Sequence, residues 1–248
     1  MISLKLRLIR EQNRLYTIAL KLVSKWQKGT EVYLFHDILE SKMEVKTQFA
    51  LSQPSFELFL LQQVDNGKRA LSFTELSDSI LNNKKTSNCF YVSFDDCNAS
   101  VYSKAYPFLK THKIPFVLFI TKELIGKPNF LTAEQIVELA KEPLCTIGSH
   151  AMHHKMFRYM TDTEATNELA ASRLYLQHLT GQSIDCFAFP YGRLVEVSCI
   201  SIKLLSNSEY KFAFSAIAGN LNQQWFSGKY YLPRVNVSEE MVKRVIND

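Results

Sequence analysis

The chain has 248 residues, of which 46% are hydrophobic and 21% are charged, a composition typical of globular proteins and not of disordered or fibrous ones. No apolar run reaches the roughly 18 residues of a membrane span, and the N-terminus lacks the apolar core of a secretory signal, so we expect a cytoplasmic protein. The formal net charge is +5, but residues 1–30 carry +6 and the remainder −1. The near-neutral charge of the residues after position 30 argues against nucleic-acid binding.

The first predicted element is a basic amphipathic helix that ends at Gly29. Its basic residues at positions 7, 10, 14, 21, 25 and 28 share one face, and Leu8, Leu15, Ile18, Leu22 and Trp26 lie on another. We predict an extension over residues 1–30 and one domain over 31–248. The basic face favours peripheral contact with anionic lipid at the inner face of the membrane. Alternatively, the apolar face packs on the domain and the basic face is solvated.

Strands and helices alternate through the rest of the chain. We predict strands at 31–38, 89–94, 115–121, 145–149, 186–190, 211–216 and 230–235, and helices at 55–66, 73–83, 99–112, 132–142, 161–181 and near 195–207. The strand at 89–94 has no polar face, which is typical of a parallel strand covered on both sides. About seven such strands are enough to close an α/β barrel, in which chemistry is found at the carboxyl ends of the strands.

Polar groups lie at the ends of four of these strands: His36-Asp37, Asp95-Asp96, His150 to His154, and Pro190-Tyr191-Gly192. Burial of two adjacent carboxylates after an apolar strand costs free energy, so such a pair indicates a functional role. The alternative is that they only cap the next helix.

His150 and His154 are four residues apart, so both imidazoles face one point if the segment turns as a helix. One aspartate added to them gives the two nitrogens and one oxygen of a catalytic zinc site, with a position open for water. The pKa of such a water falls toward about 7, and the second aspartate could take its proton.

The phrases "SFDD", "GSHxxxH" and "FAFPYG", in this order and at these spacings, resemble the polysaccharide deacetylases of the NodB-homology type (carbohydrate esterase family 4). The resemblance extends from about Glu31 to about Val237. The phrase "FHD" is similar to the biofilm poly-N-acetylglucosamine deacetylases, in the branch with "FAYPYG". The resemblance implies a distorted (β/α)7 barrel, which agrees with the strand count.

The resemblance also implies roles for single residues. Asp95 would be the general base, and Asp96, His150 and His154 would bind zinc or another divalent transition metal. The backbone N–H of Tyr191 would help to hold the oxyanion. The family's late catalytic histidine has no counterpart, because no histidine follows His178. His36 is therefore assigned as the general acid, oriented by Asp37 or a nearby carboxylate, and His153 is expected to be a neighbour of the site and not a ligand.

The resemblance implies a bacterial metal-dependent hydrolase that removes N-acetyl groups from an amino sugar, in a polysaccharide or a lipid-linked glycan precursor of the cell surface. The sequence departs from the family pattern at four positions: Cys97 for glycine, Ala151 for serine or threonine, Lys155 for proline and Ala188 for arginine. These departures leave open a catalytically inactive relative that only binds glycan. A third alternative is an O-acetyl esterase or amidase that acts on a small molecule.

Overall fold

The computed structural model describes residues 29–223 and 228–247, so the predicted N-terminal helix lies outside the described residues. The boundary between an extension and a domain near residue 30 therefore stays a prediction. No helix in the described ranges is long and apolar enough to cross a membrane.

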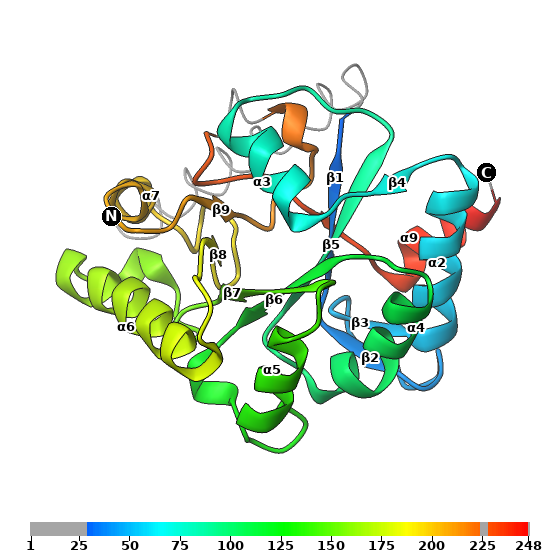
Figure 1. Ribbon diagram of the computed structural model, residues 1–248, viewed down its shortest axis with the longest axis horizontal. Coiled ribbons are helices and arrows are strands. Elements are labelled where there is room, and N and C mark those ends of the chain that lie inside the picture. Colours follow the sequence, from blue (N-terminus) through cyan, green and yellow to red (C-terminus); the bar gives the residue numbers. More distant parts are fainter. Residues whose placement is uncertain (1–28, 224–227, 248) are drawn as a thin grey trace, which may run out of the picture.

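A curled parallel sheet forms the centre of the molecule (Figure 1). Its strands run in the order β10 (Val235–Asn236), β1 (Glu31–Phe35), β5 (Cys89–Asp95), β6 (Phe116–Ile120), β7 (Cys145–Ser149), β8 (Cys186–Ala188) and β9 (Phe212–Phe214). The short β4 (Arg69–Ala70) also pairs with β5. A parallel bridge joins Phe214 of β9 to Leu232, just before β10, while β10 pairs with β1. The sheet thus curls round to meet itself, which confirms the predicted distorted barrel.

Helices lie around this sheet at the predicted places, most of them on its outside. They are α2 (Gln53–Asp65), α3 (Phe73–Leu81), α4 (Tyr106–Thr111), α5 (Ala133–Ala140), α6 (Asp162–Thr180) and α7 (Cys199–Ser206). A π-helical turn, Val101–Ala105, precedes α4. The capping box at the start of α6 is formed by Thr161 and Glu164, because each side chain bonds the other's backbone N–H.

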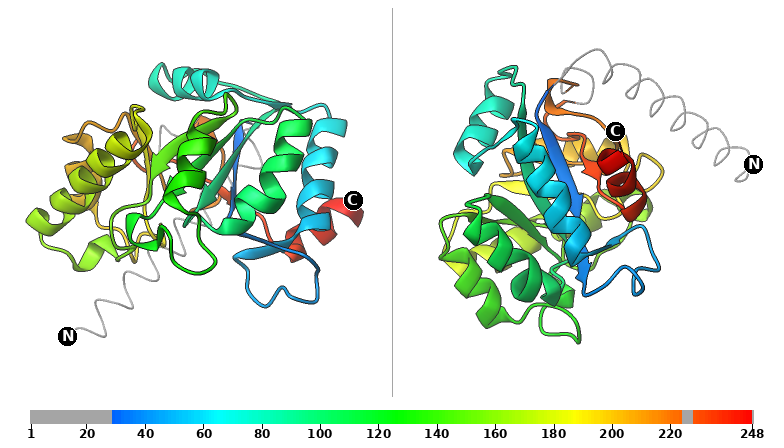
Figure 2. Two further views of the ribbon diagram at one scale, coloured as in Figure 1. Left: turned by 60° about the horizontal axis from the view of Figure 1, so that its bottom comes forward. Right: turned by 90° about the vertical axis from the view of Figure 1, so that its right-hand side faces the viewer.

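Two features were not predicted. A C-terminal helix, α9 (Glu239–Asn247), lies beside α2 in Figures 1 and 2, although the two are distant in sequence. The side-chain amide of Gln62 on α2 donates to the carbonyl of Val245 at 2.6 Å, and Glu239 accepts from the backbone N–H of Ser52 at 2.8 Å. The second feature is a separate two-stranded parallel sheet of β2 (Asp37–Leu39) and β3 (Ala50–Ser52).

Side chains of the barrel strands alternate between two hydrophobic cores. Phe90, Val92 and Phe94 of β5 pack outward, in a cluster that includes residues of α2, α4, α5 and α6. Tyr91 packs inward with Phe119 and the other interior side chains, and α3 closes the amino end of this inner core. A Cβ atom at Gly148 would lie 2.6 Å from the Phe119 ring, so only glycine leaves room for that ring.

Candidate metal centre

The sheet register brings the polar strand ends to one edge of the barrel. Phe35 pairs with Phe94, so His36 and Asp95 follow on adjacent strands. Ile120 pairs with Ser149, so His150 follows at the same edge two strands further on. Because all these pairs are parallel, the carboxyl ends of β1, β5 and β7 meet where the chemistry of a barrel is expected.

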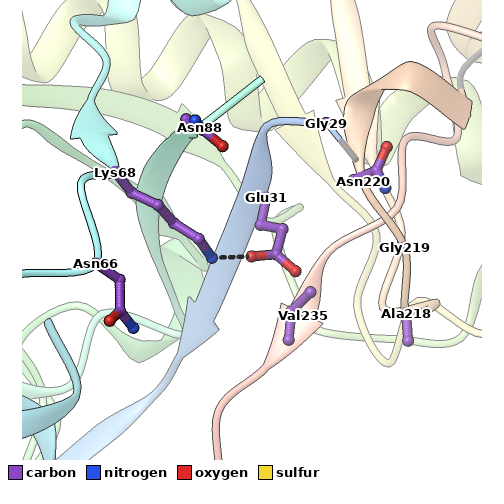
Figure 3. Close-up of a pocket in the computed structure, with 9 residues that line it drawn as sticks. All are labelled: Gly29, Glu31, Asn66, Lys68, Asn88, Ala218, Gly219, Asn220 and Val235. Atoms are coloured by element: carbon purple, nitrogen blue, oxygen red, sulfur yellow. Dashed lines mark hydrogen bonds and ion pairs between the residues drawn. The ribbon is translucent and has the colours of Figure 1, made fainter. Parts of the chain in front are cut away.

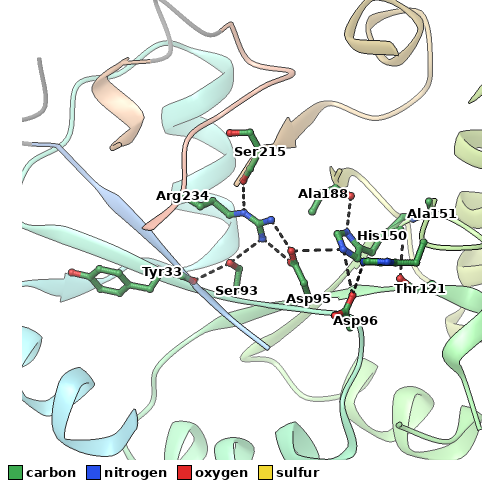
Figure 4. Close-up of polar contacts among 12 residues, drawn as sticks. Tyr33, Ser93, Asp95, Asp96, Thr121, His150, Ala151, Ala188, Ser215 and Arg234 are labelled. Atoms are coloured by element: carbon green, nitrogen blue, oxygen red, sulfur yellow. Dashed lines mark hydrogen bonds and ion pairs between the residues drawn. The ribbon is translucent and has the colours of Figure 1, made fainter. Parts of the chain in front are cut away.

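Asp96, His150 and His154 converge there (Figure 4 labels the first two). Within the described ranges, they form the one group of three whose candidate ligand atoms all lie within 4.8 Å of one another. Asp96 Oδ1 lies 3.5 Å from His150 Nε2 and 3.1 Å from His154 Nε2. This oxygen is buried, yet no hydrogen bond satisfies it among the described residues. Two nitrogens and an unsatisfied carboxylate oxygen are a donor set that fits zinc.

The loop that carries both histidines is not helical, so a helical turn is not what brings the two imidazoles together. Ala151 has φ 68° and His154 has φ 49°, and both therefore occupy the left-handed region. This conformation costs about 1–2 kcal/mol for a residue with a side chain. The two left-handed residues reverse the backbone, and the imidazole centroids lie 5.1 Å apart.

His150 is fixed in the tautomer that a metal ligand needs. Its Nδ1 lies 2.8 Å from the carbonyl oxygen of Ala188, which only accepts, so Nδ1 carries the proton and Nε2 faces Asp96. Burial lowers the pKa of His150 to about 4, which keeps the ring neutral.

The pKa shifts of Asp96 and His154 indicate that this site favours positive charge. Burial alone would raise the pKa of Asp96, but the imidazole of His154, 3.1 Å away, and the other nearby histidines outweigh it and lower that pKa. Burial alone would lower the pKa of His154, and the Asp96 carboxylate outweighs it and raises that pKa. The site is therefore suited electrostatically to hold a cation.

Asp95 faces the barrel interior and pairs with Arg234 (Figure 4). Arg234 Nη1 and Nη2 donate to the two carboxylate oxygens at 2.7 Å each, and Nε donates to the carbonyl of Ser215 at 2.8 Å. The guanidinium lies against the rings of Phe119 and Phe214, 5.4 and 5.9 Å from their centroids. Burial alone would raise the pKa of Asp95, but the charge of Arg234 outweighs it and the pKa is lowered.

The sequence analysis did not assign Arg234 to the site. The only signal was a charged residue within the apolar phrase "YYLPRV". The site also lacks the arginine of the family pattern at position 188, where the side chain is alanine and lies in the inner core. The guanidinium inside this barrel belongs instead to Arg234, which lies just before β10.

His36 lies beside the two aspartates. Its Nδ1 is buried and has no hydrogen-bond partner among the described residues. Burial lowers its pKa, and the charges of Asp95 and Asp96 oppose that shift. Asp37 accepts from Ser100 Oγ at 2.6 Å, and no described hydrogen bond joins it to His36. The ring of Phe49 packs edge-on against His36 with centroids 5.1 Å apart.

Tyr191 lies on the other side of the site. Its ring is 4.8 Å from that of His154, centroid to centroid, and its side chain is half-exposed. Tyr191 and Gly192 both have positive φ, 61° and 70°, and a Cβ at Gly192 would lie 2.5 Å from the backbone nitrogen of Ala216. The turn is thus tightly packed, which fixes the backbone of Tyr191 near His154.

Cys97 and His153 lie outside the group of three. The Cys97 thiol is buried near the carbonyl of Thr121, and burial raises its pKa to about 12, so it acts as a packing residue. His153 turns toward Glu168 of α6, where its Nδ1 lies 2.5 Å from the carboxylate. The placement of His153 agrees with the sequence-based expectation.

A pocket of about 420 Å³ lies at the opposite end of the barrel, beside the first residue of β1 (Figure 3). Lys68 and Glu31 line it and form an ion pair at 2.6 Å. The Lys68 ammonium also donates to the hydroxyl of Tyr33 and the side chain of Gln63, so its three N–H bonds are all used. Among the described residues that line the pocket, the Lys68 ammonium and the Glu31 carboxylate are thus engaged with each other, and the group of three candidate metal ligands lies at the other edge.

Comparison with known proteins assigns the class. The pattern of the polysaccharide deacetylase family matches residues 82–224, more than half of the chain. The chain belongs to this family.

Individual relatives agree with that assignment. A Bacillus subtilis protein, YxkH, named as a polysaccharide deacetylase, is 29% identical over 88% of this chain and 76% of its own. A Staphylococcus aureus poly-beta-1,6-N-acetyl-D-glucosamine N-deacetylase is 26% identical over 87% of this chain and 75% of its own. The solved structure of IcaB from Ammonifex degensii has the same fold, with a TM-score of 0.77 and 23% identity over 89% of this chain and 96% of that one.

Proposed function

We propose that this chain is a zinc-dependent N-deacetylase that removes acetyl groups from an amino sugar in a polysaccharide or a lipid-linked glycan precursor. The observation that carries the proposal is the convergence of Asp96, His150 and His154, with Asp95 beside them, 3.8 Å from His150 Nε2. The family match and the Staphylococcus aureus relative, whose name gives an N-acetylglucosamine polymer, support an amino-sugar substrate.

Asp96, His150 and His154 would hold the ion through one carboxylate oxygen and two Nε2 atoms. Zinc in such a site supplies Lewis acidity, which makes water nucleophilic near neutral pH and polarises the acetyl carbonyl. The remaining chemistry falls to the side chains and backbone around it.

Asp95 would accept the proton of the attacking water, and Arg234 keeps it ionised and aimed for that step. The backbone N–H of Tyr191 would stabilise the negative charge that develops on the carbonyl oxygen. His36 would give a proton to the sugar nitrogen as the C–N bond breaks, which releases acetate and a free amine. The buried Nδ1 of His36, with no described partner, supports this role.

The proposal is tested by acetate release from the full chain, loaded with zinc, on a panel of N-acetylglucosamine oligomers, O-acetylated sugars and small acetamides. We expect acetate from the N-acetylated oligomers, and none from a folded Asp96→Ala variant. Release from O-acetylated sugars alone would indicate an esterase. Bound zinc without acetate from any substrate would indicate an inactive glycan-binding relative.

A lipid-linked substrate would place the enzyme in the cytoplasm, in contact with the inner face of the membrane through residues 1–28. Cosedimentation with anionic vesicles at low and high salt tests this part of the proposal. We expect the full chain to bind at low salt and a chain that starts at Gly29 not to bind. Equal binding by both chains, or binding by neither, would contradict it.

A further inference from the structure

Glu168 on α6 binds the loop that connects the two histidine ligands. Its carboxylate is buried, 8% exposed. Its Oε2 accepts from the backbone N–H groups of Met152 and His153, at 2.9 and 3.1 Å. Its Oε1 lies 2.5 Å from His153 Nδ1. One carboxylate thus makes three hydrogen bonds to the residues between His150 and His154.

The loop needs such a fixed point, because its backbone conformation is unfavourable by itself. Ala151 and His154 are both left-handed without being glycine, a state that persists only where the surroundings enforce it. Ala151 and His154 flank Met152 and His153, whose N–H groups donate to Glu168. The carboxylate therefore holds the loop midway between its two reversals of direction.

The other contacts hold different parts of the loop. His150 is held by hydrogen bonds to Ile120 and Thr121, at the end of β6. The carbonyls of Ala151 and Met152 accept from the N–H groups of Lys122 and Glu123. Among the described residues, Glu168 is the side chain that satisfies the N–H groups of Met152 and His153.

His153 completes the arrangement. Its ring points to Glu168 and not to Asp96, and its side chain remains 46% exposed. This explains three histidines within five positions: His150 and His154 face the site, and His153 faces the helix that anchors the loop.

We propose that Glu168 is a positioning residue for the metal centre: it sets the loop geometry that brings His154 Nε2 to Asp96, without itself binding the ion. This inference rests on the proposed function, because it assumes that Asp96, His150 and His154 bind zinc. Side chains that hold metal ligands in place typically change metal affinity 10–100-fold when they are removed.

The test is the zinc dissociation constant of the full chain, measured by competition with a chelator at fixed pH, in Glu168→Ala, Glu168→Asp, Glu168→Gln and His153→Ala. We expect Glu168→Ala to weaken zinc about 10–100-fold. Glu168→Asp should weaken it less, because the carboxylate is withdrawn by one methylene. Glu168→Gln should restore near-normal affinity, since its carbonyl oxygen can accept both N–H bonds. His153→Ala should change affinity little, because it leaves the backbone bonds intact.

Glu164→Ala is the matched control. It removes the capping glutamate of the same helix, about one turn earlier, and touches none of the loop bonds. We expect it to lower the urea midpoint and leave zinc affinity unchanged. If Glu164→Ala weakened zinc binding as much as Glu168→Ala does, the inference would be overturned, since helix stability alone would then explain the effect. If Glu168→Ala does not fold, Glu168→Asp decides, and wild-type affinity in that variant would overturn the inference. Wild-type chain that binds no zinc would instead overturn the proposed function, and the inference with it.

Discussion

Arg234 and Asp95 form a two-point ion pair inside the barrel, with both N–O distances at 2.7 Å and both side chains buried. The pair connects the segment before β10, which closes the barrel, to the end of β5, which carries the proposed base and a proposed ligand. Closure of the fold and the orientation of Asp95 thus depend on the same contact.

Arg234→Met should lower the free energy of unfolding by about 3–5 kcal/mol, because it leaves a buried carboxylate without its partner. It should also lower kcat, since Asp95 loses the two hydrogen bonds that orient its carboxylate. Urea unfolding and acetate release measure the two effects. Arg244→Met is the control, because Arg244 pairs with Glu240 on the exposed face of α9, and it should change neither. Unchanged stability in folded Arg234→Met would contradict the role given to this pair.

Asp95→Asn should keep the metal and lose most of the turnover. The amide cannot take a proton from water, and general base catalysis typically contributes about 10²–10⁴-fold to the rate. Zinc content and kcat measured on the same sample separate the two properties. A variant that retains zinc and more than a third of the wild-type kcat would show that Asp95 is not the base.

His36→Ala should lower kcat and remove the basic limb of the pH–rate profile, because the departing amine then lacks its proton donor. Phe49→Ala is a useful companion, since it removes the ring packed on His36 and leaves the imidazole in place. The limb should survive in Phe49→Ala. A basic limb that persists unchanged in His36→Ala would mean that another group is the acid.

Glu239→Gln should destabilise the protein at neutral pH by about 1 kcal/mol, after allowance for solvent screening of this partly exposed group. Burial alone would raise the pKa of Glu239, but hydrogen bonds from Ser52 and Ser55 outweigh it and lower that pKa. Its contribution is therefore complete above the unfolded-state pKa of about 4.3 and is lost as pH falls through the lower folded-state value.

Urea midpoints at pH 7 and at about pH 3.5 test this linkage. The difference between wild type and Glu239→Gln should shrink at the lower pH. Glu240→Gln, at the neighbouring exposed position, should behave as wild type at both. A difference that grows as pH falls would contradict the assignment of Glu239 as the ionised group that holds α9 to α2.

Much of the fold could be predicted because its signals are local. Apolar runs locate most strands of the sheet, although the strand predicted at 230–235 is observed only as Val235–Asn236. In a parallel barrel the residues after the strands must meet at one edge. That is why His150, His154 and one of the two adjacent aspartates could be grouped from sequence, whereas the choice of Asp96 as the ligand was implied by the family resemblance. The helix α9 was missed because it is only nine residues long and five of them are charged or amide side chains, although Met241, Val242 and Val245 recur at helical spacing.

The Arg234–Asp95 pair could not be predicted, because its members are 139 residues apart and meet only when the barrel closes. The conformation of the loop at 150–154 could not be predicted either, because the i, i+4 spacing fits a helical turn and no glycine marks the left-handed positions Ala151 and His154. In both cases the decisive contacts come from other elements of the fold: Arg234 for the proposed base, and Glu168 of α6 for the loop of the proposed ligands.

The most direct measurement is the zinc content per chain of the purified, folded wild type and His150→Ala after equilibration with zinc and removal of the excess. His178→Ala, which removes a histidine of α6 away from the site, serves as the control. The account predicts one zinc per chain in wild type and in His178→Ala, and loss of that zinc in His150→Ala. Stoichiometric zinc retained by folded His150→Ala would contradict the assignment of Asp96, His150 and His154 as the metal ligands.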